Sequence, residues 1–258
     1  MSVRAGPSTT LRVVPLPVPG RIVLAAALAA LAAPASAEPD LTGTWERYPQ
    51  PGDTPDPALV SPPIPDPPLK PEYKAPWEAN QAKLAARIAE GQPAGDNYVH
   101  CLPDGMPAMM QGMFPMEIFQ RPEQINVTQE AFNQTRRIYF GETLPPASEL
   151  DPTFYGRSVA RWDGDTLVVE TTGIKQNVQF RWTPHSEDMK ITERLHLLTP
   201  EILRNDITVE DGYLERPWTY SYTYRRTPGY KLMEYVCEDN REYVDENGMT
   251  RLRIEGGE

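Results

Sequence analysis

Glu193 is the residue whose type and position point most directly to chemistry. If the segment Met189–Leu197 is a strand, successive side chains point to opposite faces, and Glu193 shares its face with Ile191 and Leu195. A carboxylate among core-facing apolar residues is costly unless it is paired or has a chemical role. The pattern therefore predicts an interior carboxylate that acts as an acid or base, anchors a ligand, or completes a structural ion pair.

Arg136 is the expected partner of this carboxylate. Alternation places Arg136 on one face of its strand together with Ile138, whereas Arg137 and Tyr139 fall on the other face. Two interpretations remain open for an inward pair of Arg136 and Glu193. It is either a catalytic or ligand-anchoring pair in a cavity, or a structural pair that fixes the register of the strands.

Two of the three histidines are candidate site residues. His185 lies in a turn before the Glu193 strand, where it would stand at the mouth of a barrel as a general base or serve as a solvated or capping residue. His100 adjoins Cys101 and is a candidate ligand contact, whereas His196 is expected to face solvent. The histidines are far apart, so no metal site is expected. Phosphate-loop and nucleophile motifs are absent, and no cofactor is expected.

Aromatic side chains alternate along one expected strand, with Thr and Ser residues between them. Such a stripe either packs a core or forms the wall of a cavity for a small apolar or aromatic molecule, with tyrosine hydroxyls as donors. The methionines between Met106 and Met116 suggest an apolar lid or ordinary packing. The candidate ligand contacts are Tyr139, Trp218, Tyr220, Tyr222 and His100.

The composition and the N-terminal segment restrict the compartment and the partners. The formal net charge of −11 argues against nucleic acid as a partner. Basic residues precede the apolar run Ile22–Ala33, and Ala35–Ala37 offers small cleavage-site residues, which predicts a signal peptide over residues 1–37. The run is shorter than the roughly 20 residues that cross a bilayer, so we expect no membrane span and a periplasmic or extracellular protein.

The two cysteines, Cys101 and Cys237, are expected to form a disulfide. In an oxidising compartment two cysteines pair more often than they stay free. A loop of roughly 135 residues would then be closed, which contributes about 3–5 kcal/mol by constraining the unfolded chain. Two buried thiols are the alternative.

The pattern of segments predicts a mainly β protein with one helix. A first strand within 38–48 is followed, over 49–112, by a proline-rich arm, a helix near 75–90 and the Cys101 loop. Residues 113–244 read as short strands joined by short turns, and residues 245–258 as a polar tail. Eight or nine strands suggest an antiparallel up-and-down barrel, since closure removes exposed edges. Beyond the first, the expected strands are Met116–Gln120, Gln124–Gln129, Thr135–Phe140, Arg157–Trp162, Thr166–Thr172, Lys190–Leu198, Ile202–Glu210, Trp218–Arg226 and Leu232–Cys237.

The motif Gly43-Thr44-Trp45 on the first strand resembles the Gly-x-Trp signature of calycins, the lipocalin-like barrels. The chain also resembles a group of secreted bacterial proteins, most of them described as hypothetical. Where relatives often carry histidine, this chain has Leu144 before Pro145, and Arg157 after Gly156, so histidine chemistry at those positions is not carried over. The resemblance implies a calycin-like barrel and secretion. The matching blocks are Leu41–Trp45, Cys101–Pro107, Arg136–Tyr139, Tyr155–Ser158, Trp162–Thr171, Pro184–Glu187, Thr192–Arg194 and Glu234–Cys237.

These features lead to two functional expectations. The first is a cofactor-independent lyase, isomerase or hydrolase for a small apolar or aromatic molecule, with Glu193 or His185 as the base and Arg136 stabilising negative charge. The alternative is a non-catalytic, lipocalin-like binding protein for a small hydrophobic molecule. An interaction role for the proline-rich arm is a third possibility.

Overall fold

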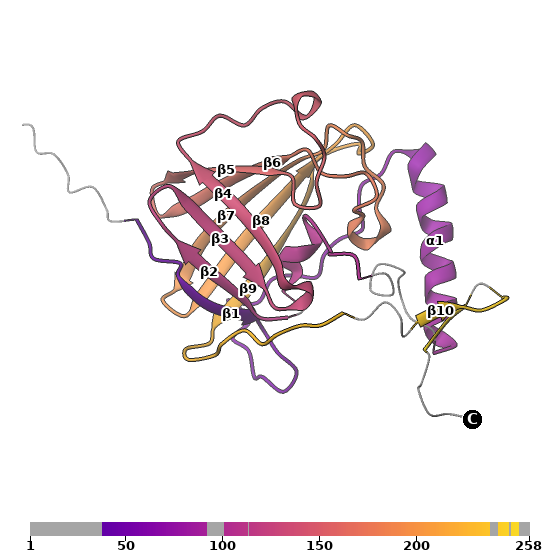
Figure 1. Ribbon diagram of the computed structural model, residues 1–258, viewed down its shortest axis with the longest axis horizontal. Helices are drawn as coiled ribbons and strands as arrows, with labels where there is room; N and C mark the ends of the chain where they lie inside the picture. The colour runs from indigo at the N-terminus through magenta and orange to yellow at the C-terminus, as the bar shows by residue number, and fades with distance from the viewer. Residues whose placement is uncertain (1–37, 92–100, 113, 238–241, 248, 253–258) are drawn as a thin grey trace, which may run out of the picture. The chain divides into compact units, whose positions relative to one another are not determined.

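Nine strands close into a barrel in chain order, and the expected mainly β, calycin-like barrel with one flanking helix is confirmed (Figure 1). The computed structural model describes residues 38–91, 101–112, 114–237, 242–247 and 249–252. The expected signal peptide and His100 lie outside the described residues. The strands are β1 (Gly43–Arg47), β2 (Met116–Gln120), β3 (Gln124–Gln129), β4 (Gln134–Phe140), β5 (Arg157–Asp163), β6 (Thr166–Thr172), β7 (Lys190–Thr199), β8 (Ile202–Glu210) and β9 (Trp218–Arg226).

One strand pairing departs from the expected antiparallel pattern. β4 and β5 pair in parallel, with Ile138 opposite Ser158, whereas the other barrel pairings are antiparallel. A parallel pair needs a crossover rather than a tight turn. The segment between Phe140 and Arg157 provides it, so the purely antiparallel prediction is wrong at this one place.

The expected strand Leu232–Cys237 is not formed. Instead β9 pairs with β1, with Trp45 opposite Arg226, and this pairing closes the barrel. A closed barrel has no unpaired edge that another strand could join. The segment after β9 therefore runs outside the sheet, where Met233 and Val236 are exposed.

Residues that alternate along each strand fill the barrel. On β7, Ile191, Glu193 and Leu195 are buried, while Arg194 on the other face is exposed. Trp45 of the Gly-x-Trp motif is completely buried, and its Nε1 donates to the Leu41 carbonyl at 2.9 Å. Burying each large apolar side chain contributes roughly 1.5–3 kcal/mol, so this inward face is the main source of stability.

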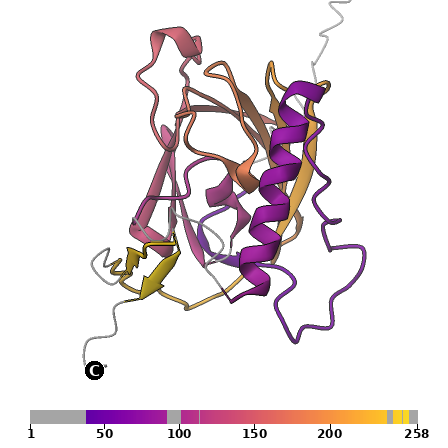
Figure 2. The same cartoon turned by 90° about the vertical axis from the view of Figure 1, so that its right-hand side faces the viewer.

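The helix α1 (Pro71–Ala89) lies outside the barrel (Figures 1 and 2). It begins earlier than expected, with Pro71 at its first position, where the missing N–H costs nothing. Trp77 is buried, and its Nε1 donates to the Arg181 carbonyl at 3.0 Å. Ile88, expected on the same apolar side, is 53% exposed, so only the N-terminal half packs firmly.

The proline-rich arm follows the outside of the barrel, as expected for a segment that cannot enter a sheet. Ser61 Oγ lies 2.7 Å from Thr223 Oγ1 on β9, and Trp218 Nε1 donates to the Pro65 carbonyl at 3.0 Å. Near its end, Leu69 forms an isolated antiparallel bridge with Leu214. The arm is therefore fixed against β9 and the loop before it.

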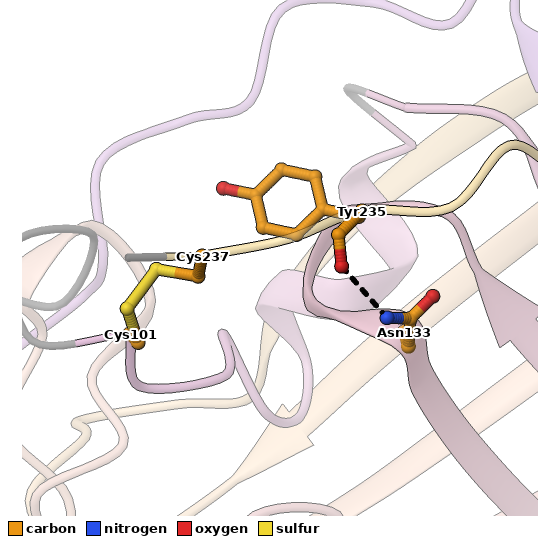
Figure 3. The surroundings of a disulfide bond; sticks show 4 residues. All are labelled: Cys101, Asn133, Tyr235 and Cys237. Carbon is orange, nitrogen blue, oxygen red and sulfur yellow. Dashed lines mark hydrogen bonds between the residues drawn. A yellow bond between two sulfur atoms is a disulfide. The ribbon is translucent and has the colours of Figure 1, made fainter. Parts of the chain in front are cut away.

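A disulfide joins Cys101 to Cys237, with an Sγ–Sγ distance of 2.09 Å (Figure 3). The predicted pairing is confirmed, but Cys237 lies in the segment after β9 rather than on a last strand. Beside it, Asn133 Nδ2 donates to the Tyr235 carbonyl at 2.9 Å, and the Tyr235 ring lies 4.9 Å from that of Phe132. The disulfide thus attaches the segment after β9 to the one before β2.

The remaining described elements are short. The segment Met106–Gln111 packs into the core, where Met106, Met109 and Met110 are buried. None of the helices in the described ranges is both long enough and apolar enough to span a membrane. These elements are the 3₁₀ helices η1 (Ala108–Gln111), η2 (Ala131–Asn133), η3 (Ala147–Glu149) and η4 (Phe180–Trp182), and the two-stranded sheet of β10 (Glu242–Val244) and β11 (Thr250–Leu252).

Candidate functional site

Arg136 and Glu193 meet inside the barrel, although 57 residues separate them in the chain. Arg136 Nη2 lies 2.5 Å from Glu193 Oε2, and the two side chains are 1% and 0% exposed. Alternation along β4 and β7 turns both side chains inward, and closure of the barrel brings them together. The pair predicted from the sequence is therefore present, and its catalytic role remains a prediction.

Three further side chains, those of Ser158, Thr171 and Asn205, contact this pair. Together with Arg136 and Glu193 they form what we call the interior polar network. Arg136 Nη2 donates to Thr171 Oγ1 at 2.8 Å, and its Nε donates to Ser158 Oγ at 3.1 Å. Asn205 Nδ2 donates to Glu193 Oε1 at 2.9 Å. Both carboxylate oxygens of Glu193 thus accept hydrogen bonds, which compensates part of the cost of burying the charge.

Four buried polar atoms at this network form no hydrogen bond of ordinary geometry with the described residues, although Arg47 lies near enough to the Tyr222 hydroxyl to act on its pKa. They are Arg136 Nη1, Asn205 Oδ1, Tyr220 Oη and Tyr222 Oη. Such atoms are rare in folded proteins, and each costs about 1–3 kcal/mol when it stays unpaired. The four belong to one contact chain, since Asn205 contacts Glu193, stands opposite Tyr222 in the β8–β9 register, and Tyr222 adjoins Tyr220.

The expected aromatic stripe lines the barrel along β9. Trp218, Tyr220, Tyr222 and Tyr224 are all buried. Burial raises the pKa of Tyr220 and Tyr224 well above the usual value, and it raises that of Tyr222 against the opposing effect of nearby arginines. The phenols are therefore neutral hydrogen-bond donors at ordinary pH.

Tyr139, an expected ligand contact, and Tyr224, a member of the aromatic stripe, differ in their placement from Tyr220 and Tyr222. The Tyr224 hydroxyl donates to the Met110 carbonyl, so its donor is already used. Tyr139 faces the outside of β4, where the Arg157 guanidinium lies 4.1 Å from its ring centre. Tyr139 therefore does not join the interior set, as its alternation with Arg136 implies.

His185 is buried, and both of its ring nitrogens face backbone carbonyls. Nδ1 lies 2.8 Å from the Ser186 oxygen and Nε2 lies 2.9 Å from the Val178 oxygen. A neutral imidazole donates one of these bonds, and an imidazolium donates both. The cavity beside His185 has a volume of only about 20 Å³. This geometry does not favour a general base at His185, whose role stays a prediction.

A larger cleft of about 580 Å³ lies between the proline-rich arm, η1 and η4. We call it the arginine cleft, because Arg47 and Arg181 are the charged residues that line it. Sequence reasoning missed both. Arg47 follows Trp45 by two residues, so alternation could have placed it inward, whereas Arg181 carries no such signal. The lining residues are Arg47, Val60, Ser61, Pro62, Pro63, Ile64, Gln111, Phe180 and Arg181.

Tyr222 lies between a residue of the arginine cleft, Arg47, and a residue of the interior polar network, Asn205. The Arg47 guanidinium carbon lies 4.2 Å from the centre of the Tyr222 ring. Arg47 and Arg181 both act to lower the pKa of Tyr222, although burial raises it more strongly. None of the clefts and cavities described here is lined by Arg136 or Glu193. Within the described ranges no group of three or more His, Cys, Asp or Glu residues could hold a metal ion.

Comparisons with known proteins add little to this geometry. No family model matches the chain, and no curated protein matches it. A solved structure of a mutant of the fluorescent protein UnaG is similar over 72% of this chain and 96% of its own, at 15% sequence identity and a TM-score of 0.33. A likeness at that TM-score carries no functional argument, and the barrel assignment rests on the strand pairing itself.

Proposed function

We propose that the protein binds a small, largely apolar or aromatic molecule through the barrel interior, and that the unpaired polar atoms hold the polar group of that molecule. The observation that carries the proposal is the set of four buried, unpaired atoms at the interior polar network. One of them is a guanidinium donor, one an amide acceptor and two are hydroxyls that can donate or accept. A ligand hydroxyl or carbonyl would satisfy such a set.

The surroundings support an apolar ligand body. The Tyr220 ring lies 5.0 Å from that of Trp218 and 5.5 Å from that of Phe180, and Ile207 stands opposite it on β8. Binding sites for small molecules typically combine such apolar and aromatic walls with a few placed polar groups. We infer that a ligand would enter from the arginine cleft, because Phe180 lines that cleft and Arg47 lies on the Tyr222 ring.

The geometry favours binding over acid–base catalysis at Glu193. Both of its oxygens already accept hydrogen bonds, from Arg136 and Asn205, and these bonds hold the carboxylate in an ion pair of structural type. The hydrogen bonds of the interior polar network instead fix the positions of its unpaired atoms, as a preorganised binding site requires. The lyase, isomerase or hydrolase activity expected from the sequence stays a prediction.

Binding of 2-naphthol and indole tests the proposal. We expect the wild-type protein to bind 2-naphthol, measured by calorimetry and by ligand-observed NMR. The double variant Tyr220→Phe/Tyr222→Phe should bind it about tenfold more weakly, since each lost hydrogen bond is worth about 0.5–1.5 kcal/mol. Tyr224→Phe is the matched control, because its hydroxyl is already bonded to Met110 and its loss should leave the affinity unchanged.

Two outcomes would contradict the interior site. One is a wild-type protein that binds neither compound at millimolar concentration. The other is a double variant that binds 2-naphthol as tightly as the wild type while remaining folded by near-ultraviolet circular dichroism. Phenylalanine fills nearly the same volume as tyrosine, so the double variant tests the hydroxyls rather than the packing.

We also propose that the protein works outside the cytoplasm. The disulfide between Cys101 and Cys237 supports this, since such bonds persist mainly in oxidising compartments. Expression of the full chain with its own leader, followed by N-terminal sequencing of the exported protein, should give a chain that starts at Glu38. Retention of the uncleaved chain in the cytoplasm would contradict the proposal.

A further inference from the structure

We propose that the arginine cleft is a second binding site, for the anionic group of a small aromatic molecule such as an aryl carboxylate. The inference goes beyond the interior site, because it concerns other residues and the charge of the ligand. Its basis is the cleft of about 580 Å³, whose lining combines two arginines with mainly apolar residues. Pockets of this size commonly hold small molecules.

The charges at the cleft oppose the charge of the whole chain. The formal net charge is −11, yet the charged residues that line this cleft are Arg47 and Arg181. The carboxylates on either side of Arg47 in the chain, Glu46 and Asp53, pair with Arg225 instead. A local positive site on an acidic surface attracts anions selectively, because the remaining surface repels them.

Among the described residues, one carboxylate, that of Asp66, forms an ion pair with Arg181, and this pair is weak. Asp66 Oδ1 lies 3.6 Å from Arg181 Nη2, and the Asp66 side chain is 75% exposed. Exposed ion pairs of this kind contribute little, because water and salt screen them. A ligand carboxylate that is enclosed by the cleft would therefore compete well for the same guanidinium.

Both guanidinium groups are held in place by neutral partners. Arg47 Nη1 donates to the Gln111 carbonyl at 3.1 Å, and its guanidinium lies over the Tyr222 ring. Arg181 Nη1 donates to the Ile64 carbonyl, also at 3.1 Å. A guanidinium has five N–H groups, so these contacts leave donors on each arginine for a ligand. Holding the donors in advance lowers the entropic cost of binding.

The backbone at Arg181 is itself constrained. Arg181 and Trp182 have φ values of 53° and 55°, in the left-handed region that side chains other than glycine rarely adopt. The helix α1 stabilises this turn, because Trp77 Nε1 and Gln81 Nε2 both donate to the Arg181 carbonyl at 3.0 Å. Backbone strain of this type concentrates at ligand-binding positions. The Arg181 side chain reaches the arm, where its Nη1 donates to the Ile64 carbonyl, and Arg47 lines the same cleft.

The remaining wall defines the body of the ligand. Val60, Pro62, Pro63, Ile64 and Phe180 present aliphatic and aromatic surface to the cleft. Such a wall favours a flat apolar body, and the two arginines favour a carboxylate on it. An inorganic anion would interact with the two arginines but not with the apolar wall.

The experiment compares 1-naphthoate with neutral 1-naphthalenemethanol by calorimetry at low ionic strength. The wild-type protein should bind naphthoate at least about tenfold more tightly than the alcohol. Arg47→Gln/Arg181→Gln should remove that preference, whereas Arg137→Gln, which removes an exposed arginine from the outer face of β4, should retain it. Higher salt should weaken the binding of naphthoate alone.

Equal affinity for the two compounds in the wild type would overturn the proposal, and so would an unchanged preference in the folded double variant. If Arg47→Gln does not fold, Arg181→Gln and Arg47→Lys serve in its place. The partly exposed Arg181 side chain is replaced with little loss of packing, and lysine keeps the charge. The two proposals can fail separately. If naphthoate loses its preference in the arginine variant while the affinity for 2-naphthol is unchanged in Tyr220→Phe/Tyr222→Phe, the interior proposal fails and the cleft proposal stands.

Discussion

Glu193 and His185 belong to one continuous segment and are both buried, but their surroundings differ. Both His185 nitrogens face backbone carbonyls, and the neighbouring Ser186 donates its N–H and its hydroxyl to Asp211, at 2.9 and 2.7 Å. Each Glu193 oxygen also accepts a hydrogen bond, yet the partners Arg136 and Asn205 each keep an unpaired atom. The side chains of His185 and Ser186 therefore have hydrogen-bond partners, whereas atoms of the interior network do not.

The difference shows why residue type alone is a poor guide to a site. His185 is a candidate catalytic base by its residue type, but both of its ring nitrogens lie against backbone carbonyls, and its role stays a prediction. The buried ion pair is structural by its residue types, but unpaired polar atoms remain around it, and the proposed ligand site rests on these atoms. Four changes of decreasing effect test this contrast between the network and the turn.

Breaking the ion pair should have the largest effect. Arg136→Met leaves the Glu193 carboxylate buried without its countercharge, so the free energy of unfolding should fall by about 3–5 kcal/mol. Adding Glu193→Leu should restore much of the loss, since an apolar pair carries no desolvation cost. Urea unfolding measures both. A double variant no more stable than Arg136→Met would show that the pair is not the source of the effect.

Alkaline pH should lower the free energy of unfolding through the buried tyrosine Tyr220, and not through His185. Burial raises the pKa of Tyr220, so above pH 10 the unfolded chain releases this proton while the folded protein retains it. The free energy of unfolding therefore falls as the pH rises. In Tyr220→Phe the fall should be shallower by about 1.4 kcal/mol per pH unit, and in His185→Ala it should match the wild type. Identical slopes in Tyr220→Phe and wild type would contradict the burial of this phenol.

Removing the imidazole should destabilise the turn without affecting binding. His185→Ala leaves the Ser186 and Val178 carbonyls without this partner, which should cost about 2 kcal/mol in thermal or chemical unfolding. The affinity for 2-naphthol should stay unchanged. His196→Ala, on the outer face of β7, is the control and should change stability by less than about 0.5 kcal/mol. Loss of 2-naphthol binding in folded His185→Ala would mean that the turn belongs to the site.

The smallest expected effect is a difference in the free energy of unfolding between variants of two neighbouring tyrosines, Tyr222 and Tyr224. Tyr224→Phe deletes a hydroxyl that donates to Met110 and should cost about 1 kcal/mol. Tyr222→Phe deletes an unpaired hydroxyl and should cost about zero or stabilise slightly, since no bond is lost. Chemical unfolding of the two variants side by side gives the difference. Equal losses would show that the Tyr222 hydroxyl has a partner in the folded protein.

The local features of this protein follow from its sequence. Alternation placed Arg136, Glu193 and the β9 aromatics on inward faces, because the side-chain period of a strand is a local property. Five strands, including β8 and β9, have the bounds that their residues predict. The pairing of Cys101 with Cys237 followed from their number and the expected compartment.

Only the tertiary structure decided which of these residues meet. That Arg136 contacts Glu193 depends on closure of the barrel, and the parallel pairing of β4 with β5 depends on the crossover between them. The bonding of His185 to Val178 and the convergence of Arg47 with Arg181 bring together segments that no local pattern connects. The face to which each side chain points is a local property of a strand, whereas contacts between distant segments depend on the packing of the whole chain. The sequence therefore determined the faces, and the fold decided which of these residues meet.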